Sequence, residues 1–153
     1  MKIALYKGRK RLFNKLVSWW TRGPYSHVEL VLDDGISISS SFMDGGVRKK
    51  RIDFDLSNWD FIELGLESDW FSDRIDKRLA YEQSIRDRIF NIKGKLYDVL
   101  GIAGFVIRRI GEDRDKMFCS EAVAYILGFD DPWRFAPNTL ASALKAIKRN
   151  DRR

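Results

Sequence analysis

Hydrophobic and polar residues alternate with a period of two along much of the first 66 residues, which predicts β-strands. In the clearest run, Val28, Leu30 and Leu32 point to one side of the predicted strand. His27 and Glu29 point to the other side. The strands predicted on this basis cover residues 2–6, 27–32, 36–42, 47–54 and 59–66.

The turn signal at 33–35, Asp-Asp-Gly, predicts a hairpin between the second and third of these strands. A three-residue turn would place Leu30 opposite Ile38 and keep the apolar face continuous. A two-residue turn would reverse the faces. The three-residue register puts three serines on the side of His27, namely Ser37, Ser39 and Ser41.

The second half of the chain follows a helical period instead. Helices are predicted at 72–92, with Ile75, Leu79, Ile85 and Ile89 inward, and at 96–110. A short helix precedes Gly128, and Asn138 can cap a final helix. The chain is therefore predicted as a single α+β domain over 1–153. A small antiparallel sheet or partial barrel, with strands in 1–66, would pack against helices in 72–149.

An earlier basic segment at 10–20 also has helical spacing, through Leu12, Phe13, Leu16, Val17 and Trp20. Core contacts are the favoured interpretation of this stripe. The alternative is a lid or interfacial segment that holds an acyl or lipid substrate, with Trp19 and Trp20 facing that substrate.

Composition limits the possible environments. A single cysteine, Cys119, cannot form an internal disulfide, so the chain suits a reducing cytosol. No apolar region typical of a signal peptide follows the N-terminus, and the apolar stretch at 100–107 is too short to span a bilayer. We therefore expect a cytoplasmic protein without a transmembrane segment, and the composition suits a bacterial or phage origin.

The formal net charge of +6 raises the possibility of a nucleic-acid partner. The basic clusters at 7–11, 48–51 and 145–153 contain no interleaved aromatic residues and match no nucleic-acid-binding motif, which argues against it. One histidine and one cysteine leave only carboxylates to complete a zinc shell. We therefore expect neither a metal nor another cofactor.

The candidate chemistry centres on Cys119, which lies at the predicted start of a helix within Phe118-Cys119-Ser120-Glu121. The positive end of a helix dipole favours thiolate, and the N–H groups of Cys119 and Ser120 can stabilise an oxyanion. The competing interpretation is a small buried hydrophobic residue. Because a thiol nucleophile needs a base, the only histidine, His27, is the candidate base. Glu121 is interpreted as a stabilising charge in the first turn.

Several short motifs occur in an informative order: Tyr25-Ser26-His27-Val28, a serine-rich strand before Gly45-Gly46-Val47, Tyr97-Asp98, Phe118-Cys119-Ser120-Glu121 and Pro137-Asn138-Thr139-Leu140. In this order the chain resembles the permuted papain-like, NlpC-type cysteine hydrolases of the YiiX/YebB-like group. The resemblance implies an NlpC-like α+β fold. It also implies a Cys-His site that cleaves an amide, ester or thioester through an acyl-enzyme.

The resemblance assigns Cys119 as the nucleophile, His27 as the general base and Tyr25 as an aromatic residue that lines the site. The family usually has Glu, His, Asn or Gln as a third residue that orients the histidine ring. Here the corresponding strand carries serines, and spacing favours Ser39. Ser41 and Glu29 are the alternatives. The Cα atoms of residues two apart on one strand, such as His27 and Glu29, are about 7 Å apart, and their side chains rarely bind one another.

The function expected from the sequence is therefore a cysteine hydrolase of the peptidase or amidase type. Its substrate would be a peptide, a peptidoglycan-like molecule or an acyl lipid. The alternative is a catalytically weak or inactive binding or inhibitory protein on the same fold, which acts through its basic surface. The departure from the family at Ser39 motivates that alternative, because a hydroxyl stabilises an imidazolium less than a carboxylate does.

Overall fold

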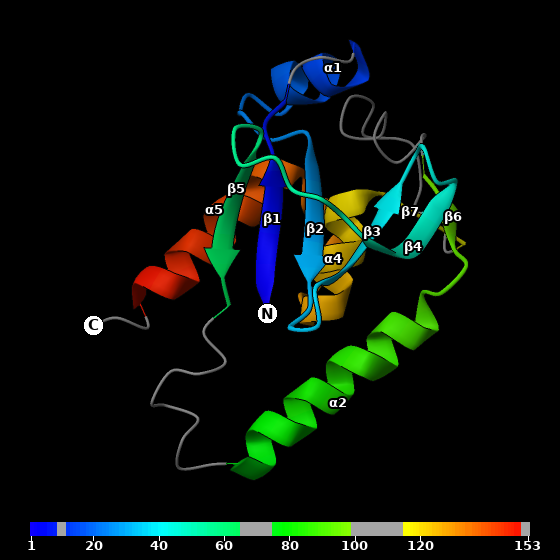
Figure 1. Cartoon of the computed structure of the whole chain (residues 1–153), viewed down its shortest axis with the longest axis vertical. Coiled ribbons are helices and arrows are strands. Elements are labelled where there is room, and N and C mark those ends of the chain that lie inside the picture. Colours follow the sequence, from blue (N-terminus) through cyan, green and yellow to red (C-terminus); the bar gives the residue numbers. More distant parts are fainter. Residues whose placement is uncertain (9–11, 65–74, 99–114, 151–153) are drawn as a thin grey trace.

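The computed structural model describes residues 1–8, 12–64, 75–98 and 115–150 (Figure 1). In these residues the strands are β1 (Lys2–Tyr6), β2 (His27–Val31), β3 (Ile36–Ser41), β4 (Gly46–Arg51), β5 (Trp59–Glu63), β6 (Leu96–Tyr97) and β7 (Lys116–Met117). The helices are α1 (Leu12–Trp20), α2 (Ile75–Asn91), α4 (Cys119–Leu127) and α5 (Pro137–Asn150), with a 3₁₀ turn, η1, at Pro132–Arg134. The strands form one open sheet in the order β5-β1-β2-β3-β4-β6-β7.

The predicted α+β class is confirmed, with neighbouring strands antiparallel except for the parallel pair β6 and β7. The helix predicted at 96–110 is wrong at its start, because Leu96 and Tyr97 form strand β6. The N–H of Tyr97 donates to the carbonyl of Gly45 at 3.1 Å. A side chain at Gly46 would clash with the Lys95 carbonyl, so glycine permits this close pairing. Residues 99–110 lie outside the described residues.

The hairpin between β2 and β3 has the predicted three-residue register. Leu30 pairs with Ile38, and the N–H of Leu32 donates to the carbonyl of Ile36 at 2.9 Å. Gly35 adopts a left-handed conformation with φ of 78°, which glycine accepts without strain. Leu30 and Ile38 are both fully buried, so the turn keeps the apolar face of the sheet continuous.

The core lies between this apolar face and the helices α4 and α5, which Figure 1 shows behind the sheet. Most of α4 is buried, from Cys119 through Ala124 and again at Ile126, which explains why its sequence is mostly apolar after Glu121. The helix ends as predicted at Gly128, which has φ of 83° and donates its N–H to Tyr125. The fixed position of α4 in the core therefore sets the position of Cys119 at its first turn.

Two helix residues predicted to face the core are exposed instead. Leu79 in α2 is 59% exposed and Leu16 in α1 is 55% exposed. The predicted Ile85 and Ile89 of α2 are buried in the core, and the side chain of Ile75 lies outside the described residues. A helical period identifies a stripe but does not show where along the helix the neighbouring elements end.

Asn138 has a different role from the predicted helix cap, because α5 begins one residue earlier at Pro137. Its side chain binds the segment that leads into β2. The Asn138 Oδ1 accepts from the N–H of Tyr25 at 3.0 Å, and Nδ2 donates to the Tyr25 carbonyl at 2.8 Å and to Thr21 Oγ1 at 2.6 Å. Asn138 thus ties α5 to the chain immediately before His27.

Substitution of Asn138→Ala is expected to lower the free energy of unfolding by about 2 kcal/mol, because it leaves the backbone polar groups of Tyr25 without their partner. Urea unfolding followed by tryptophan fluorescence measures this change. The matched control is Asn58→Ala, whose side-chain bonds to Asp55 and Ser57 are exposed, with an expected loss below about 0.5 kcal/mol. Equal losses in the two variants would contradict the role assigned to Asn138.

Candidate active site

His27 is the first residue of β2, and its side chain is partly buried, with 21% exposed. Its Nε2 lies 2.6 Å from Oε1 of Glu29. Cys119 is the other group close to the ring, near enough to raise the pKa of His27. Because Nε2 is directed at Glu29, Nδ1 is the ring nitrogen left for the thiol. The imidazole therefore lies between a carboxylate and a thiol.

Glu29 is fully buried, and Arg48 of β4 holds its carboxylate from the other side. The Arg48 Nη1 donates to Oε2 at 2.7 Å and Nη2 donates to Oε1 at 2.5 Å. This two-pronged contact is the strong geometry for an arginine and a carboxylate. Arg48 also donates from Nε to Asp44 at 3.0 Å, which connects the buried pair to the surface.

The serine-rich strand β3 separates β2 from β4, and its small side chains make the contact between Glu29 and Arg48 possible. Arg48 pairs with Ser39 across the ladder between β3 and β4. Its guanidinium must therefore pass Ser39 to reach Glu29, and a larger residue at this position would obstruct it. The serines that were expected to orient the histidine instead leave room for the arginine.

Among the described residues, Ser39 makes no hydrogen bond to the histidine ring. Its hydroxyl donates to the Val28 carbonyl at 2.6 Å. The ladder between β2 and β3 ends at the Leu30–Ile38 pair, so the Ser39 hydroxyl binds backbone where the strands diverge. Ser41, the second alternative, has Asp44 as its side-chain partner.

The structure thus brings Glu29, rather than Ser39, to the imidazole. The argument from spacing placed same-strand neighbours too far apart, because it measured the separation of their Cα atoms. The two long side chains lean toward one another at the end of the strand and close that distance. Arg48 in addition directs the Glu29 carboxylate.

Cys119 is the first residue of α4, with Phe118 as the N-cap. The N–H groups of Cys119 and Ser120 belong to the first turn, where the helix provides no acceptor for them. The Glu121 carboxylate accepts from the N–H of Phe118 at 3.2 Å, which agrees with its interpretation as a stabilising residue. The buried hydroxyl of Ser120 has no hydrogen-bond partner in the described part of the chain.

The charges around the ring favour a protonated histidine. Burial by itself lowers the pKa of His27, but the neighbouring Cys119 and Glu29 outweigh it and raise the pKa to about 10. Burial raises the pKa of Glu29, but His27 and Arg48 more than offset this and hold that pKa below its ordinary value. At neutral pH the structure therefore favours an imidazolium against a carboxylate.

The two predicted substrate-binding aromatics have different outcomes. Tyr25 is buried in the core cluster, and its hydroxyl donates to Asp60 Oδ2 at 2.9 Å. Its contacts are therefore those of a structural residue. Trp20 ends α1, but its side chain lies outside the described residues.

Sequence reasoning missed Arg48 as a neighbour of the site, and it named Tyr97 only as part of a motif, without a role. Burial, with Cys119 and Asp98 nearby, raises the pKa of Tyr97, so its hydroxyl stays neutral beside the thiol. Asp98, the second residue of the Tyr97-Asp98 motif, is buried directly after β6. For Arg48 a signal existed, because its alternation within β4 and the hairpin register place it in the same row as Ser39 and Glu29.

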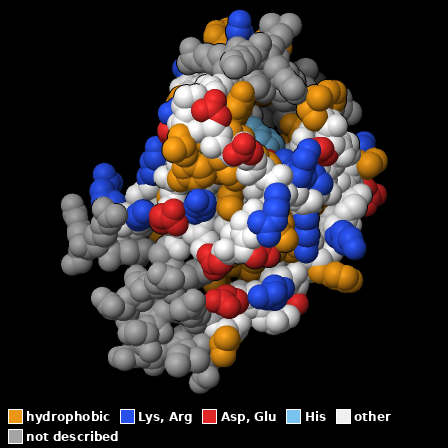
Figure 2. All heavy atoms as spheres, in the orientation of Figure 1, with side chains coloured by type: hydrophobic (Ala, Val, Ile, Leu, Met, Phe, Trp, Pro, Cys, Tyr) orange, Lys and Arg blue, Asp and Glu red, His pale blue; other side chains and the backbone are white. Residues whose placement is uncertain are grey.

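The surface near the histidine is hollowed and partly aromatic. Figure 2 shows the single histidine at the bottom of a depression bordered by hydrophobic and charged side chains. Trp59 lies edge-on to the His27 ring at 6.3 Å between centroids, and Tyr6 packs on Trp59 at 4.9 Å. Apolar rings therefore border the candidate site on the side of β1 and β5.

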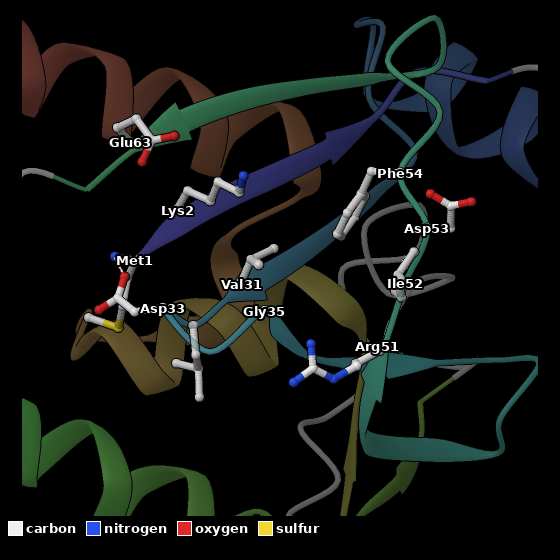
Figure 3. Close-up of a pocket in the computed structure, with 11 residues that line it drawn as sticks. Met1, Lys2, Val31, Asp33, Gly35, Arg51, Ile52, Asp53, Phe54 and Glu63 are labelled. Carbon is white, nitrogen blue, oxygen red and sulfur yellow. Dashed lines mark hydrogen bonds and ion pairs between the residues drawn. The ribbon is translucent and has the colours of Figure 1, made fainter.

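A separate groove of about 740 Å³ opens at the other end of β2, beside Val31 (Figure 3). Val31 is four residues from His27, or about 13 Å along a strand. Lys2, Arg51, Asp53 and Glu63 line this groove, so it carries charges of both signs. The groove therefore does not extend the Cys-His pair.

Comparison with protein-family models and with curated proteins finds no match to this chain. Within the described ranges, no group of three or more His, Cys, Asp or Glu residues is arranged to hold a metal ion. None of the described helices combines the length and apolar character needed to cross a membrane.

The single histidine makes its ionisation directly measurable. Its Cε1 proton should titrate in an NMR experiment with a midpoint near the pKa of about 10. The Glu29→Gln and Cys119→Ser variants should each lower that midpoint, because each removes a group that raises the pKa of His27. Since the folded pKa exceeds the ordinary value of 6.5, this interaction stabilises the fold fully below pH 6.5 and loses its effect as the pH rises toward 10. A midpoint at or below 6.5 in the native chain would contradict this electrostatic account.

Proposed function

We propose that this protein is a cysteine hydrolase of the permuted papain-like, NlpC-type class, with Cys119 as nucleophile, His27 as base and Glu29 as the residue that orients the ring. The observation that carries the proposal is the His27 imidazole held between the Cys119 thiol and the buried Glu29 carboxylate. A nucleophile, a base and an orienting acid in contact are the three groups that thiol-based acyl transfer requires.

Glu29 also bears on the alternative of a weakened binding protein. That alternative rested on serines at the ring-orienting position. A carboxylate stabilises the imidazolium that forms during catalysis, which a hydroxyl does less well. The Glu29 contact therefore favours an active hydrolase over an inactive relative.

In the proposed reaction, the Cys119 thiolate attacks the carbonyl carbon of an amide, ester or thioester, and the carbonyl electrons move to oxygen. The N–H groups of Cys119 and Ser120 stabilise that oxyanion. The tetrahedral intermediate collapses, the His27 imidazolium gives its proton to the leaving group, and a thioester to Cys119 remains.

The second half of the reaction reverses these roles. The neutral imidazole accepts a proton from water, and the resulting hydroxide attacks the thioester carbonyl. Collapse of this second intermediate releases the carboxylic acid and returns the Cys119 thiolate beside the His27 imidazolium. Throughout, Glu29 stays ionised and Arg48 stays protonated, and both act by position and charge.

The reactivity of Cys119 tests the pair. At pH 6 the alkylation of Cys119 by iodoacetamide should slow by about 100-fold in His27→Ala, because the cation that favours thiolate is lost. Glu29→Gln should slow it by a smaller factor. The matched control Ser39→Ala should react nearly as the native chain does. The proposal of Glu29 as the orienting residue fails if Ser39→Ala slows alkylation more than Glu29→Gln.

The acyl-enzyme tests the reaction itself. On mixing with p-nitrophenyl acetate, we expect a burst of p-nitrophenolate and one acetyl group on the chain by intact-mass spectrometry. Cys119→Ala should carry none. His27→Ala should reduce the rate of acylation by about 10²–10⁴-fold, the usual contribution of a general base. If Cys119 is alkylated rapidly at pH 6 but takes up no acetyl group from this or other activated esters, the thiol is reactive but the protein is not a hydrolase.

A further inference from the structure

Helix α1 presents two large apolar side chains, Leu16 and Trp19, to the surface. Trp19 is 73% exposed and Leu16 is 55% exposed, whereas Val17 and Ser18 are buried. Because Leu16 and Trp19 are three residues apart, they lie on one side of the helix. A helix that served only its own core would bury these two large residues and expose the serine.

The surroundings of Trp19 are strongly basic. Lys15 and Arg22, both exposed, line a groove of about 680 Å³ together with Trp19 and Pro24. Among the residues that the structure describes, no acidic side chain lines this groove. In the sequence, the first 28 residues contain seven Lys and Arg residues and no Asp or Glu, and Glu29 is the first acidic residue. The groove, with its two exposed cations, therefore suits an anionic partner.

The position of α1 connects this surface to the candidate active site. Figure 1 shows α1 at the end of the sheet where β1 finishes and β2 begins, and His27 is the first residue of β2. Between them, Asn138 binds both Thr21 and Tyr25. A surface that holds α1 therefore lies near the mouth of the Cys-His pair.

We propose that α1 docks on the surface of an anionic lipid bilayer. Trp19 and Leu16 enter the boundary between headgroups and acyl chains, and Lys15 and Arg22 bind lipid phosphates. Tryptophan prefers this boundary because one part of its ring system is apolar and its N–H is polar. Basic residues beside an exposed apolar helix face are typical of interfacial helices.

A bilayer fits these features better than a nucleic acid does. Phosphate recognition in nucleic acids would use the two cations, but Leu16 would remain exposed to water in such a complex. A bilayer uses the cations and both apolar residues. The docking does not require Cys119 or His27, so it stands independently of the proposed hydrolase activity.

Vesicle cosedimentation tests the proposal. The full chain should bind vesicles of phosphatidylcholine and phosphatidylglycerol, bind vesicles of phosphatidylcholine much more weakly, and dissociate as the salt concentration rises. Trp19→Ser should weaken binding by about tenfold. Lys15→Gln and Arg22→Gln should each weaken it by about fivefold. All three residues are exposed, so the variants should fold, which circular dichroism checks.

The structure offers a matched control at the 3₁₀ turn η1. There Trp133 is 41% exposed and lies under Arg134 at 5.0 Å, so it is another exposed tryptophan beside a cation. Trp133→Ser should leave vesicle binding unchanged, as should Cys119→Ala. Loss of binding in Trp19→Ser but not in Trp133→Ser supports the proposal.

Three results would overturn it: no binding to anionic vesicles, equal binding to both vesicle types, or equal effects of Trp19→Ser and Trp133→Ser. Sedimentation of the free chain identifies another occupant. A dimer that Trp19→Ser dissociates, without vesicle binding, would assign this face to a second copy of the chain. Vesicle binding by the Cys119→Ala variant, which cannot form an acyl-enzyme, keeps this test separate from that of the hydrolase.

Discussion

The buried carboxylate of Glu29 is the constraint on which the candidate site depends. A fully buried charge is costly unless charged or hydrogen-bonding partners surround it. Arg48 binds both oxygens of Glu29, and His27 binds one of them. These contacts join β2 to β4 across β3, which lies between them. They therefore fix the positions of these strands and of the imidazole ring relative to one another. Loss of either cation would leave the buried carboxylate undercompensated.

The same contacts produce an alternation of charge from the interior to the surface. Glu29 lies between His27 and Arg48, and Arg48 lies between Glu29 and the partly exposed Asp44. Each charge has opposite neighbours, which limits the net charge buried with the site. In the proposed mechanism, a Cys119 thiolate would complete the series at its inner end. A protonated histidine is then the resting form, ready to donate to a leaving group.

The two reactive residues are positioned by separate parts of the fold. The sheet and Asn138 of α5 hold the start of β2, and hence His27. The core holds α4, and hence Cys119. The ring and the thiol therefore lie where the sheet packs against α4. This explains why a single contact between residues 92 positions apart in the sequence can be well defined.

The sequence by itself determined the α+β class, the hairpin register and the end of α4, because periodicity and turn residues act locally. It also singled out Cys119 and His27, each the only residue of its type. Two-residue strands such as β6 carry no readable period, so they appear only in the structure. The tertiary structure decided between Ser39 and Glu29, and it introduced Arg48. Spacing along a chain sets distances between Cα atoms, whereas strand divergence and the lean of long side chains decide which groups meet.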